Sequence, residues 1–217
     1  MTTSGEKVIM SKSKTNKTSI AKRFRGFLPV VVDIETAGLN PATDAILEIA
    51  AVILDLDENK KIHPVETHFA HVVPFEGANL DKEALEFNGI DPYQPLRFAV
   101  EEPQALDIIC KPIHQAMQKT GCYKAVLVGH NPTFDITFLQ AAIKRTNYQN
   151  NPFHAFTTLD TATLAALAYE HTVLAVAVKK AGIEFEVQQA HSALYDATKT
   201  AELFCKIINR WQELARQ

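Results

Sequence analysis

Two carboxylates stand close together in an otherwise apolar segment that runs from Phe27 to Thr36. Three consecutive valines precede them, a composition typical of a buried β-strand. Because successive side chains of a strand point to opposite faces, Asp33 and Glu35 lie on the same face. Neighbouring carboxylates repel each other unless a cation lies between them, and oxygen ligands of this kind suit Mg²⁺ or Mn²⁺. The segment therefore predicts part of a divalent-metal site, although Asp-x-Glu alone is also common at solvated strand ends.

A second acid follows another apolar run. Residues 125–128 read Ala-Val-Leu-Val, the composition of a central strand, and lead directly to His130. Asn131 is suited to cap a helix and Pro132 to take its first position, so that Asp135 falls in the first helical turn. This order predicts that Asp135 comes to the same end of the sheet as the first pair of acids.

A third segment pairs a histidine with an acid near the end of the chain. His191 and Asp196 are five residues apart, which on one helix corresponds to a separation of about 140°. They converge only if His191 lies in the loop before the helix, with Ser192 as the N-cap. We therefore expect a helix over 192–211 that carries Asp196 near its start.

The elements that must position these side chains follow from hydrophobic spacing and turn residues. The pattern predicts strands over 27–36, 46–54, 66–73, 125–128 and 156–159. It predicts helices over 81–88, 104–120, from 132, from 161, over 172–181 and over 192–211. Pro112 is expected to kink or split the second of these helices. An early hairpin followed by alternating strands and helices indicates one α/β domain with a mixed five-stranded sheet flanked by helices.

Three polar residues on the predicted hairpin strands receive no chemical role. Glu48 interrupts the apolar strand 46–54, and because nothing in the sequence gives it a partner, we interpret it as structural or edge-facing. His68 and His71 are three apart on a strand, so they face opposite sides and cannot share a metal. We expect both histidines to be ordinary strand residues.

Charge is distributed unevenly along the 217 residues, whose net charge is −3. Residues 1–25 contain seven basic side chains and one acid, and the remaining 192 residues hold 15 basic and 24 acidic side chains, a net charge of −9. The Ser/Thr/Lys/Asn-rich composition predicts a disordered tail over 1–20 and one domain over 21–217. Arg23 and Arg25, next to the first strand, are the better candidates for phosphate contacts.

The remaining composition excludes several classes of protein. The three cysteines, Cys110, Cys122 and Cys205, are odd in number and lack Cys-x-x-Cys spacing, which favours reduced thiols in a cytoplasm over a disulfide framework or a zinc site. No apolar run is long enough to cross a bilayer, and the N-terminus lacks the pattern of a secretory signal. We therefore expect a cytoplasmic protein.

Taken together and in this order, the three acid-bearing segments resemble the three exonuclease motifs of the DEDDh superfamily of 3′→5′ exonucleases, which share a ribonuclease H-like fold. The resemblance covers residues 25–211. Within the superfamily, the chain most resembles the bacterial ribonuclease T family. The segments that carry this closer resemblance are Arg23-Phe24-Arg25-Gly26-Phe27, Ile34-Glu35-Thr36-Ala37-Gly38, Gly77-Ala78-Asn79-Leu80, Phe87-Asn88-Gly89-Ile90-Asp91-Pro92, Asn151-Pro152-Phe153-His154 and Gln189-Ala190-His191-Ser192-Ala193-Leu194-Tyr195-Asp196.

The resemblance implies a catalytic site of four carboxylates and one histidine. Two Mg²⁺ ions about 4 Å apart, with Mn²⁺ able to substitute, would be bound by Asp33, Glu35, Asp135 and Asp196, with Asp33 between them. His191 would take the proton from the attacking water. The products would be nucleoside 5′-monophosphates released one at a time from a 3′ end.

The resemblance also implies which residues contact the terminal bases of RNA. Phe87, Phe134 and Phe156 would stack on the bases, and Glu83 would contact a base edge. Leu39 departs from the family pattern, because the family has a stacking phenylalanine there. Leucine keeps an apolar contact but loses the flat ring, so we expect a softer preference for the 3′ base.

A basic patch and a homodimer are implied in the same way, each subunit's patch serving the partner's active site. Arg23, Arg25 and Lys124 remain in the patch, whereas Gln118 and Gln149 occupy positions that are usually basic. The implied substrates are the 3′ ends of tRNA, which would be trimmed in end turnover, and of other stable RNAs, which would be matured. Single-stranded DNA 3′ ends are a further candidate. An oligoribonuclease, a proofreading-type DNA exonuclease and a catalytically silent nucleic-acid-binding module are the alternatives.

Overall fold

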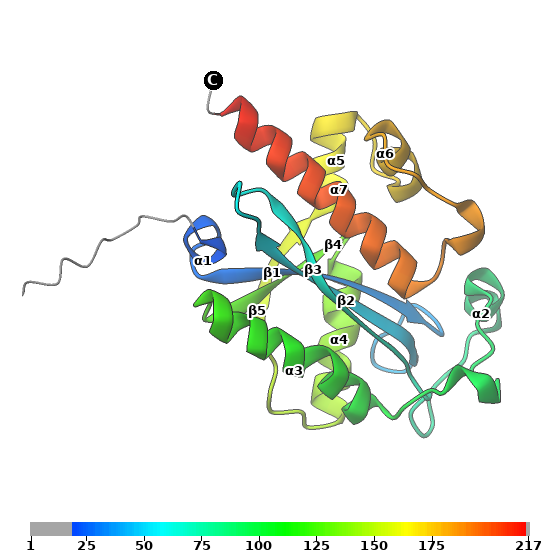
Figure 1. Ribbon diagram of the computed structural model, residues 1–217. Helices are drawn as coiled ribbons and strands as arrows, with labels where there is room; N and C mark the ends of the chain where they lie inside the picture. The colour runs from blue at the N-terminus through cyan, green and yellow to red at the C-terminus, as the bar shows by residue number, and fades with distance from the viewer. Residues whose placement is uncertain (1–18, 216–217) are drawn as a thin grey trace, which may run out of the picture.

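The computed structural model describes residues 19–215, in which a five-stranded sheet is covered by helices (Figure 1). The strands are β1 (Phe27–Thr36), β2 (Ile46–Leu56), β3 (Ile62–His71), β4 (Lys124–Gly129) and β5 (Phe153–Asp160), in the spatial order β3-β2-β1-β4-β5. Neighbouring strands are antiparallel on the β3-β2-β1 side and parallel on the β1-β4-β5 side. The prediction of a mixed five-stranded sheet with an early hairpin is confirmed.

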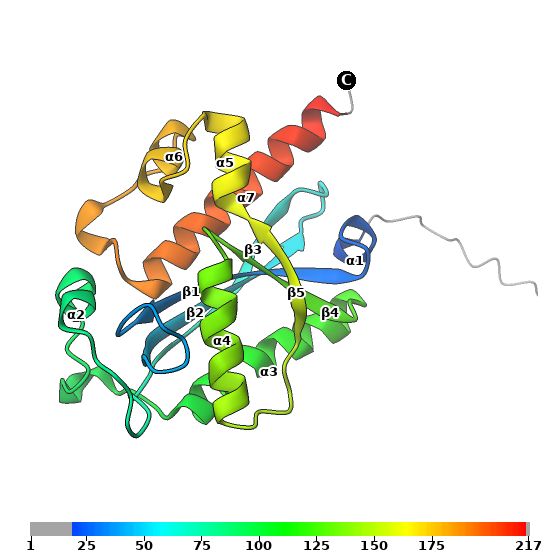
Figure 2. The same ribbon diagram turned by 180° about the vertical axis from the view of Figure 1, so that it is seen from behind.

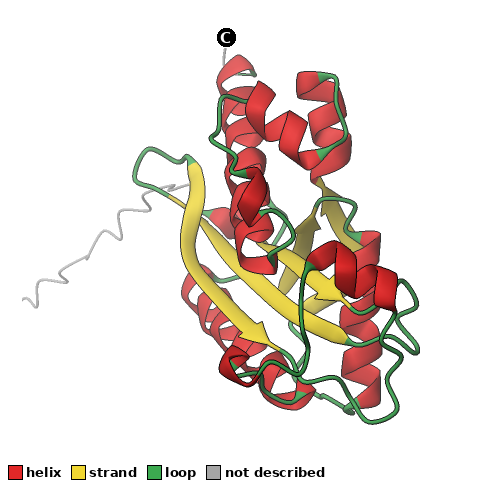
Figure 3. Ribbon diagram, turned by 90° about the vertical axis from the view of Figure 1, so that its right-hand side faces the viewer, coloured by secondary structure: helices red, strands yellow, loops and turns green. Residues whose placement is uncertain are grey.

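Helices cover both faces of this sheet. They are α1 (Ile20–Arg23), α2 (Lys82–Asn88), α3 (Glu102–Thr120), α4 (Thr133–Arg145), α5 (Thr161–Tyr169), α6 (Leu174–Lys180) and α7 (Ala193–Leu214). The long helix α7 packs on β1, β2 and β3, with α5 and α6 beside it, whereas α3 and α4 lie on the other face (Figures 2 and 3). Helix α2 lies next to the end of β1 (Figure 1).

Burial of the central strands follows from these two helical layers. Val30, Val31 and Val32 of β1 are at most 1% exposed, and β2 is buried without interruption from Ile46 to Leu54. A strand that is covered on both faces reads as a nearly continuous apolar run, and both strands do so apart from their few acids. The sheet is therefore a rigid base for the side chains at the end of β1.

Helix α3 contains the proline that was expected to kink or split it. It runs from Glu102 to Thr120 as one α-helix with Pro112 inside it, so the proline does not split it. Ile109 and Ile113, on either side, are fully buried in the core. This packing offsets the hydrogen bond that a proline cannot donate, since tertiary contacts supply most of the stability of a helix in a protein.

The ends of the described region bear on two further expectations. Residues 1–18, most of the expected tail, lie outside the described residues. Ser19 caps α1 through its side chain, and Ile20 is buried in the core, so Ile20 belongs to the folded part of the chain.

Within residues 19–215 no single helix is long and apolar enough to cross a bilayer. Only α5 and α6 together, with a bend of 43°, have the required length and composition.

Candidate active site

The first two acids extend from the end of the central strand. Asp33 and Glu35 are partly buried and lie on the same side of β1, opposite Ala50 and Glu48 of β2 in the antiparallel register. Because β1 pairs with β4 over residues 27–31 and with β2 over residues 30–36, every residue of the strand has a neighbouring strand. The predicted Asp-x-Glu pair therefore lies near the end of a central strand, on a part of it that pairs with β2.

The third acid comes from the junction between β4 and α4. Asp135 lies in the first turn of α4 and is 4% exposed. The predicted cap is wrong by one residue: Pro132 is the N-cap, and Asn131 has a left-handed backbone with φ of 64°. A Cβ atom at Gly129 would lie 3.1 Å from Cβ of Pro132 and 3.4 Å from Oδ2 of Asp135. This close approach explains why glycine stands where the chain turns into α4.

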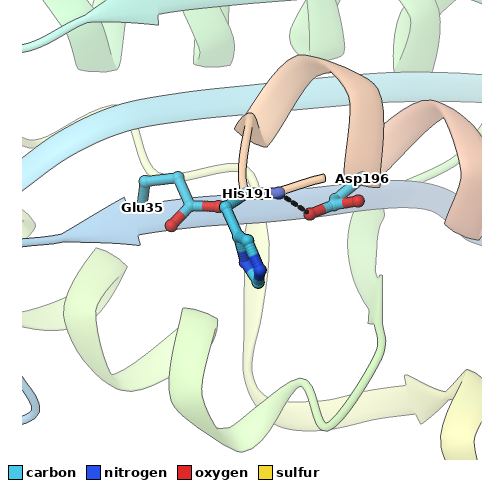
Figure 4. Close-up of side chains that lie close together, drawn as sticks. All are labelled: Glu35, His191 and Asp196. Atoms are coloured by element: carbon cyan, nitrogen blue, oxygen red, sulfur yellow. Dashed lines mark hydrogen bonds between the residues drawn. The ribbon is translucent and has the colours of Figure 1, made fainter. Parts of the chain in front are cut away.

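The histidine and the fourth acid are placed as the spacing predicts. His191 lies in the loop before α7, with φ of 66°, and Asp196 lies in the first turn of the helix. The His191 backbone N–H donates to Oδ2 of Asp196 at 3.0 Å (Figure 4). Burial raises the pKa of Asp196, while this hydrogen bond lowers it. Ser192 holds the predicted N-cap position, but its side chain makes no cap hydrogen bond.

The carboxyl groups repel one another inside a poorly solvated site. Burial raises the pKa of Asp33 well above its usual range, and the charges of Asp135 and Glu35 raise it further, followed by that of Asp196. Burial and then the charges of Asp196 and Glu48 raise the pKa of Glu35 to about 8. Burial also raises the pKa of Asp135 to about 8, although backbone N–H groups lower it. Four acids from three elements therefore share one electrostatic environment.

The donor atoms of this site fit divalent cations. One ligand atom from each of Glu35, His191 and Asp196 lies within 4.8 Å of the other two (Figure 4). The Oδ1 atom of Asp196 is buried without a hydrogen-bond partner. Carboxylate oxygens are the ligands that Mg²⁺ and Mn²⁺ prefer. Asp33 and Asp135 fall outside this group of three but add two carboxylates beside it.

A cavity of about 580 Å³ opens beside the acids. It is lined by Glu35 and by four of the side chains to which the resemblance assigns base contacts, namely Leu39, Glu83, Phe87 and Phe134. Leu39 and Phe87 are 83% and 70% exposed, so their apolar surfaces are open to a ligand. The Phe87 ring centroid lies 4.4 Å from that of His191. An apolar wall therefore leads directly to the carboxylates.

The other predicted contact residues lie outside this cavity. Phe156 is 82% exposed on β5 and contacts the ring of His154. Lys124 pairs with Phe27 at the start of β1. Phe27 precedes Asp33 by six residues, which at about 3.3 Å per residue corresponds to about 20 Å along the strand. Arg25 is exposed before the same strand end, and Arg23 donates to backbone carbonyl groups of Lys60 and Ile208.

Sequence reasoning missed one acid that shapes the cavity. Asp44 is 5% exposed and accepts hydrogen bonds from the Asn40 N–H, the Thr43 hydroxyl and the Asn79 amide. A Cβ atom at Gly38 would lie 2.0 Å from Oδ2 of Asp44. The loop that carries Leu39 is thus closed around a buried carboxylate. The turn residues after β1 signalled the loop but not this acid.

Glu48 is buried and structural, as one of the two interpretations has it, but it does have partners, which the sequence did not indicate. Its Oε2 accepts from the Ala193 N–H at 3.1 Å, and its Oε1 lies 3.1 Å from Nδ1 of His71. His71 is therefore not an ordinary strand residue, whereas His68 pairs with Glu66 near the surface. The signal in the sequence was an acid inside an otherwise apolar strand.

Comparison with known proteins gives a family for this fold and site. A family model described as "Exonuclease" matches residues 30–204. Ribonuclease T of Hahella chejuensis is 55% identical over 206 residues, 94% of each chain, and ribonuclease T of Marinobacter nauticus is 57% identical over 205 residues, 94% of this chain and 93% of the relative.

Solved structures agree on the fold. Escherichia coli Exonuclease I in complex with a dT13 oligonucleotide superposes with a TM-score of 0.64 at 20% identity, over 88% of this chain and 43% of that one. A 3′-exonuclease that recognises a histone mRNA stem-loop superposes with a TM-score of 0.63 at 19% identity, over 84% of this chain and 64% of that one. At these identities the likeness concerns the fold alone.

The sheet order, the acids gathered at the end of β1 and the family match define an exonuclease, which is a hydrolase of phosphodiester bonds. The relatives above are more than half identical over nearly their whole length. The chain belongs to the ribonuclease T family.

Proposed function

We propose that this chain is a Mg²⁺-dependent 3′→5′ exoribonuclease that trims the 3′ ends of tRNA and matures other stable RNAs in the cytoplasm. The observation that carries the proposal is the cavity lined by Leu39, Phe87 and Phe134, which opens onto Glu35 beside the other acids. It can admit a single-stranded end and bring its last phosphodiester to the carboxylates. The ribonuclease T relatives support RNA as the substrate.

The chemistry proposed is hydrolysis assisted by divalent cations. Asp33, Glu35, Asp135 and Asp196 would hold two Mg²⁺ ions, which when bound neutralise the charge of the scissile phosphate and activate the attacking water. His191 is exposed in its loop, where its imidazole can accept the proton of that water. The Asp196 carboxylate holds the His191 backbone and so orients the ring. The product is a nucleoside 5′-monophosphate.

Recognition of the RNA end is proposed to depend on stacking. Phe87 and Phe134 present rings in the cavity and Glu83 presents a carboxylate that can accept from a base edge. A ring–base stack contributes about 1–3 kcal/mol and tolerates any base. Leu39 gives an apolar contact without a ring. Phe156, exposed on β5, would contact a base further along the strand.

We further propose that the enzyme acts as a homodimer. Lys124 and Arg25 lie at the start of β1, about 20 Å along the strand from the acids of the same subunit. A basic patch at that distance cannot contact the last nucleotide bound in its own subunit, but in a dimer it can hold RNA that enters the partner's site. Phosphate contacts of this kind supply affinity that does not depend on sequence.

The test is degradation of an RNA that carries a 5′ label and a single-stranded 3′ end. With Mg²⁺ the label should pass through a ladder of fragments shortened from the 3′ end, with release of nucleoside 5′-monophosphates, and EDTA should stop the reaction. Asp33→Asn should lower the rate more than about 100-fold, since even residues behind metal ligands cost about 10- to 100-fold. Unshortened RNA with Mg²⁺, or full shortening in EDTA, would contradict the proposal. Rates on tRNA, dinucleotides and DNA primers identify the substrate class.

A further inference from the structure

Glu48 is a buried acid to which the proposed chemistry assigns no role. On β2 it lies directly opposite Glu35 of β1 in the register, and only 7% of it is exposed. Glutamate is almost never buried to this degree unless it is paired. Its position beside the acids, where a further negative charge is unfavourable, calls for a specific reason.

The two oxygens of Glu48 have different partners on different elements. Oε2 accepts a buried hydrogen bond from the backbone N–H of Ala193, the first residue of α7. Oε1 lies 3.1 Å from Nδ1 of His71, on the neighbouring strand β3. The carboxylate therefore joins β2, β3 and the start of α7, three elements that are distant in sequence.

At the start of α7 this hydrogen bond replaces a missing cap. The first N–H groups of a helix need acceptors, and the Ser192 side chain provides none. Glu48 supplies an acceptor for the Ala193 N–H, and a negative charge at a helix N-terminus is favourable. The same helical turn carries Asp196, which in turn binds the backbone of His191. The first turn of α7 thus links the hydrogen bond of Glu48 to that of Asp196.

The loop that carries His191 borders a cavity of about 570 Å³, lined by Glu48, His191, Ser192 and Tyr195 among others. Among the described residues, the three side chains placed to hold an ion are Glu35, His191 and Asp196, and Glu48 is not one of them. Its Oε2 is hydrogen-bonded to Ala193, and its Oε1 faces Nδ1 of His71 at 3.1 Å.

We propose that Glu48 is a positioning residue, whose hydrogen bond to Ala193 fixes the start of α7 and thereby sets Asp196 and His191 against Glu35. The inference rests on the proposed function, which gives Asp196 and His191 their roles. The charge of Glu48 adds to the repulsion among the acids, so it cannot be the reason that an acid stands there. The proposed role therefore depends on the length of the side chain and on the position of its acceptor oxygen.

Two substitutions separate geometry from charge. Glu48→Gln keeps the length of the side chain and an acceptor oxygen but removes the charge, whereas Glu48→Asp keeps the charge and withdraws the carboxylate by one methylene group. We expect kcat on RNA with saturating Mg²⁺ to fall about 10- to 100-fold for Glu48→Asp, and to stay within about threefold for Glu48→Gln, with KM little changed in both. Hydrogen exchange of the Ala193 amide should accelerate only in Glu48→Asp.

Glu102→Asp is the matched control, because Glu102 is also a buried acid, 5% exposed, and binds Arg145 through two hydrogen bonds on the α3–α4 side. It should lower Tm while leaving kcat and the Ala193 exchange rate unchanged. A kcat in Glu48→Asp equal to the wild-type value would overturn the proposal. A tenfold loss of kcat in Glu48→Gln, with the Ala193 amide still protected from exchange, would also overturn it. This second test remains usable if Glu48→Asp does not fold. If the wild-type protein does not shorten RNA, the proposed function is wrong. The hydrogen-exchange rate of the Ala193 amide still tests whether Glu48 fixes the start of α7.

Discussion

At the scale of single residues, the four acids are placed where they can bind a ligand, although their mutual repulsion and burial destabilise the folded protein. The Oδ1 atom of Asp196 is buried with no hydrogen-bond partner, and burial raises the pKa of Asp33, Glu35 and Asp135. Native proteins leave buried polar atoms unpaired where an ion or a substrate completes them. The destabilisation at these residues is therefore best explained by the cations that they are placed to bind.

Stability of the metal-free protein should accordingly depend on pH. The pKa of Glu35 is raised from 4.5 to about 8 and that of Asp135 from 3.8 to about 8, so between these values the folded state binds more protons than the unfolded state. The free energy of unfolding must then fall as pH rises through this window. In EDTA, Tm should fall between about pH 5 and pH 9, and excess Mg²⁺ should flatten the curve. Glu35→Gln should show a shallower fall, and a Tm that rises with pH in EDTA would refute the assignment.

Leu39 offers a test of stacking by a single side chain. It lines the cavity and is 83% exposed, so Leu39→Phe can add a ring without repacking a core. We expect KM for RNA to fall about fivefold, which is the low end of the range for a ring–base stack, because leucine already supplies some apolar contact. Leu167→Phe, on an exposed part of α5 outside the cavity, is the control and should leave KM unchanged. Equal KM values for both variants would show that Leu39 does not touch the base.

At the scale of elements, the first strand carried the clearest signal, whereas β3 and β5 begin four and three residues before their predicted starts. The bounds predicted for β1 agree with the structure, because its apolar run and the turn at Gly38 mark both ends. The start of α4 was predicted one residue too early, since Asn131 takes a left-handed conformation instead of capping. Such a conformation depends on partners elsewhere: the Asn131 N–H donates to Asp160, the N-cap of α5. Local propensity contains no information about that contact.

The junction between β4 and α4 gives a prediction at this scale. Gly129→Ala would place a Cβ atom 3.1 Å from Cβ of Pro132 and 3.4 Å from Oδ2 of Asp135, so the first turn of α4 must move. We expect a destabilisation of about 1–3 kcal/mol together with a loss of kcat, measured by denaturant unfolding and RNA hydrolysis. Gly77→Ala is the control, because its φ of 78° strains alanine but no atom lies within 4 Å of the added carbon. It should lose stability and keep kcat. Retention of full kcat in Gly129→Ala would show that Asp135 tolerates displacement.

At the scale of the whole molecule, the order of elements predicted the α/β sheet, but the contacts that complete the site could not be predicted. The hydrogen bond between Glu48 and Ala193 joins residues 145 positions apart, and the closure of the Leu39 loop around Asp44 depends on Asn79, which is 35 positions away. A single sequence shows residue types and local spacing, and these contacts exist only once the strands have paired. The four acids were predicted because motif order was sufficient to group them.

The proposed dimer can be tested by mixing inactive subunits. One subunit would carry Asp196→Asn with an intact basic patch, and the other Arg25→Ala and Lys124→Ala with intact acids. If each patch serves the partner's site, mixed dimers contain one complete site, and equal mixing after reversible dissociation should restore about a quarter of wild-type activity. Each variant alone should remain far below that level. A mixture no more active than the sum of its components would show that the patch, if it binds RNA, serves its own subunit.

The central claim is that acids from β1, α4 and α7 meet to bind divalent cations. The most direct measurement is anomalous X-ray diffraction from crystals grown with Mn²⁺. We predict anomalous density in contact with the carboxylates of Asp33, Glu35, Asp135 and Asp196, and its loss in Asp196→Asn crystals. Manganese bound elsewhere on the molecule while this cluster stays empty would contradict the account.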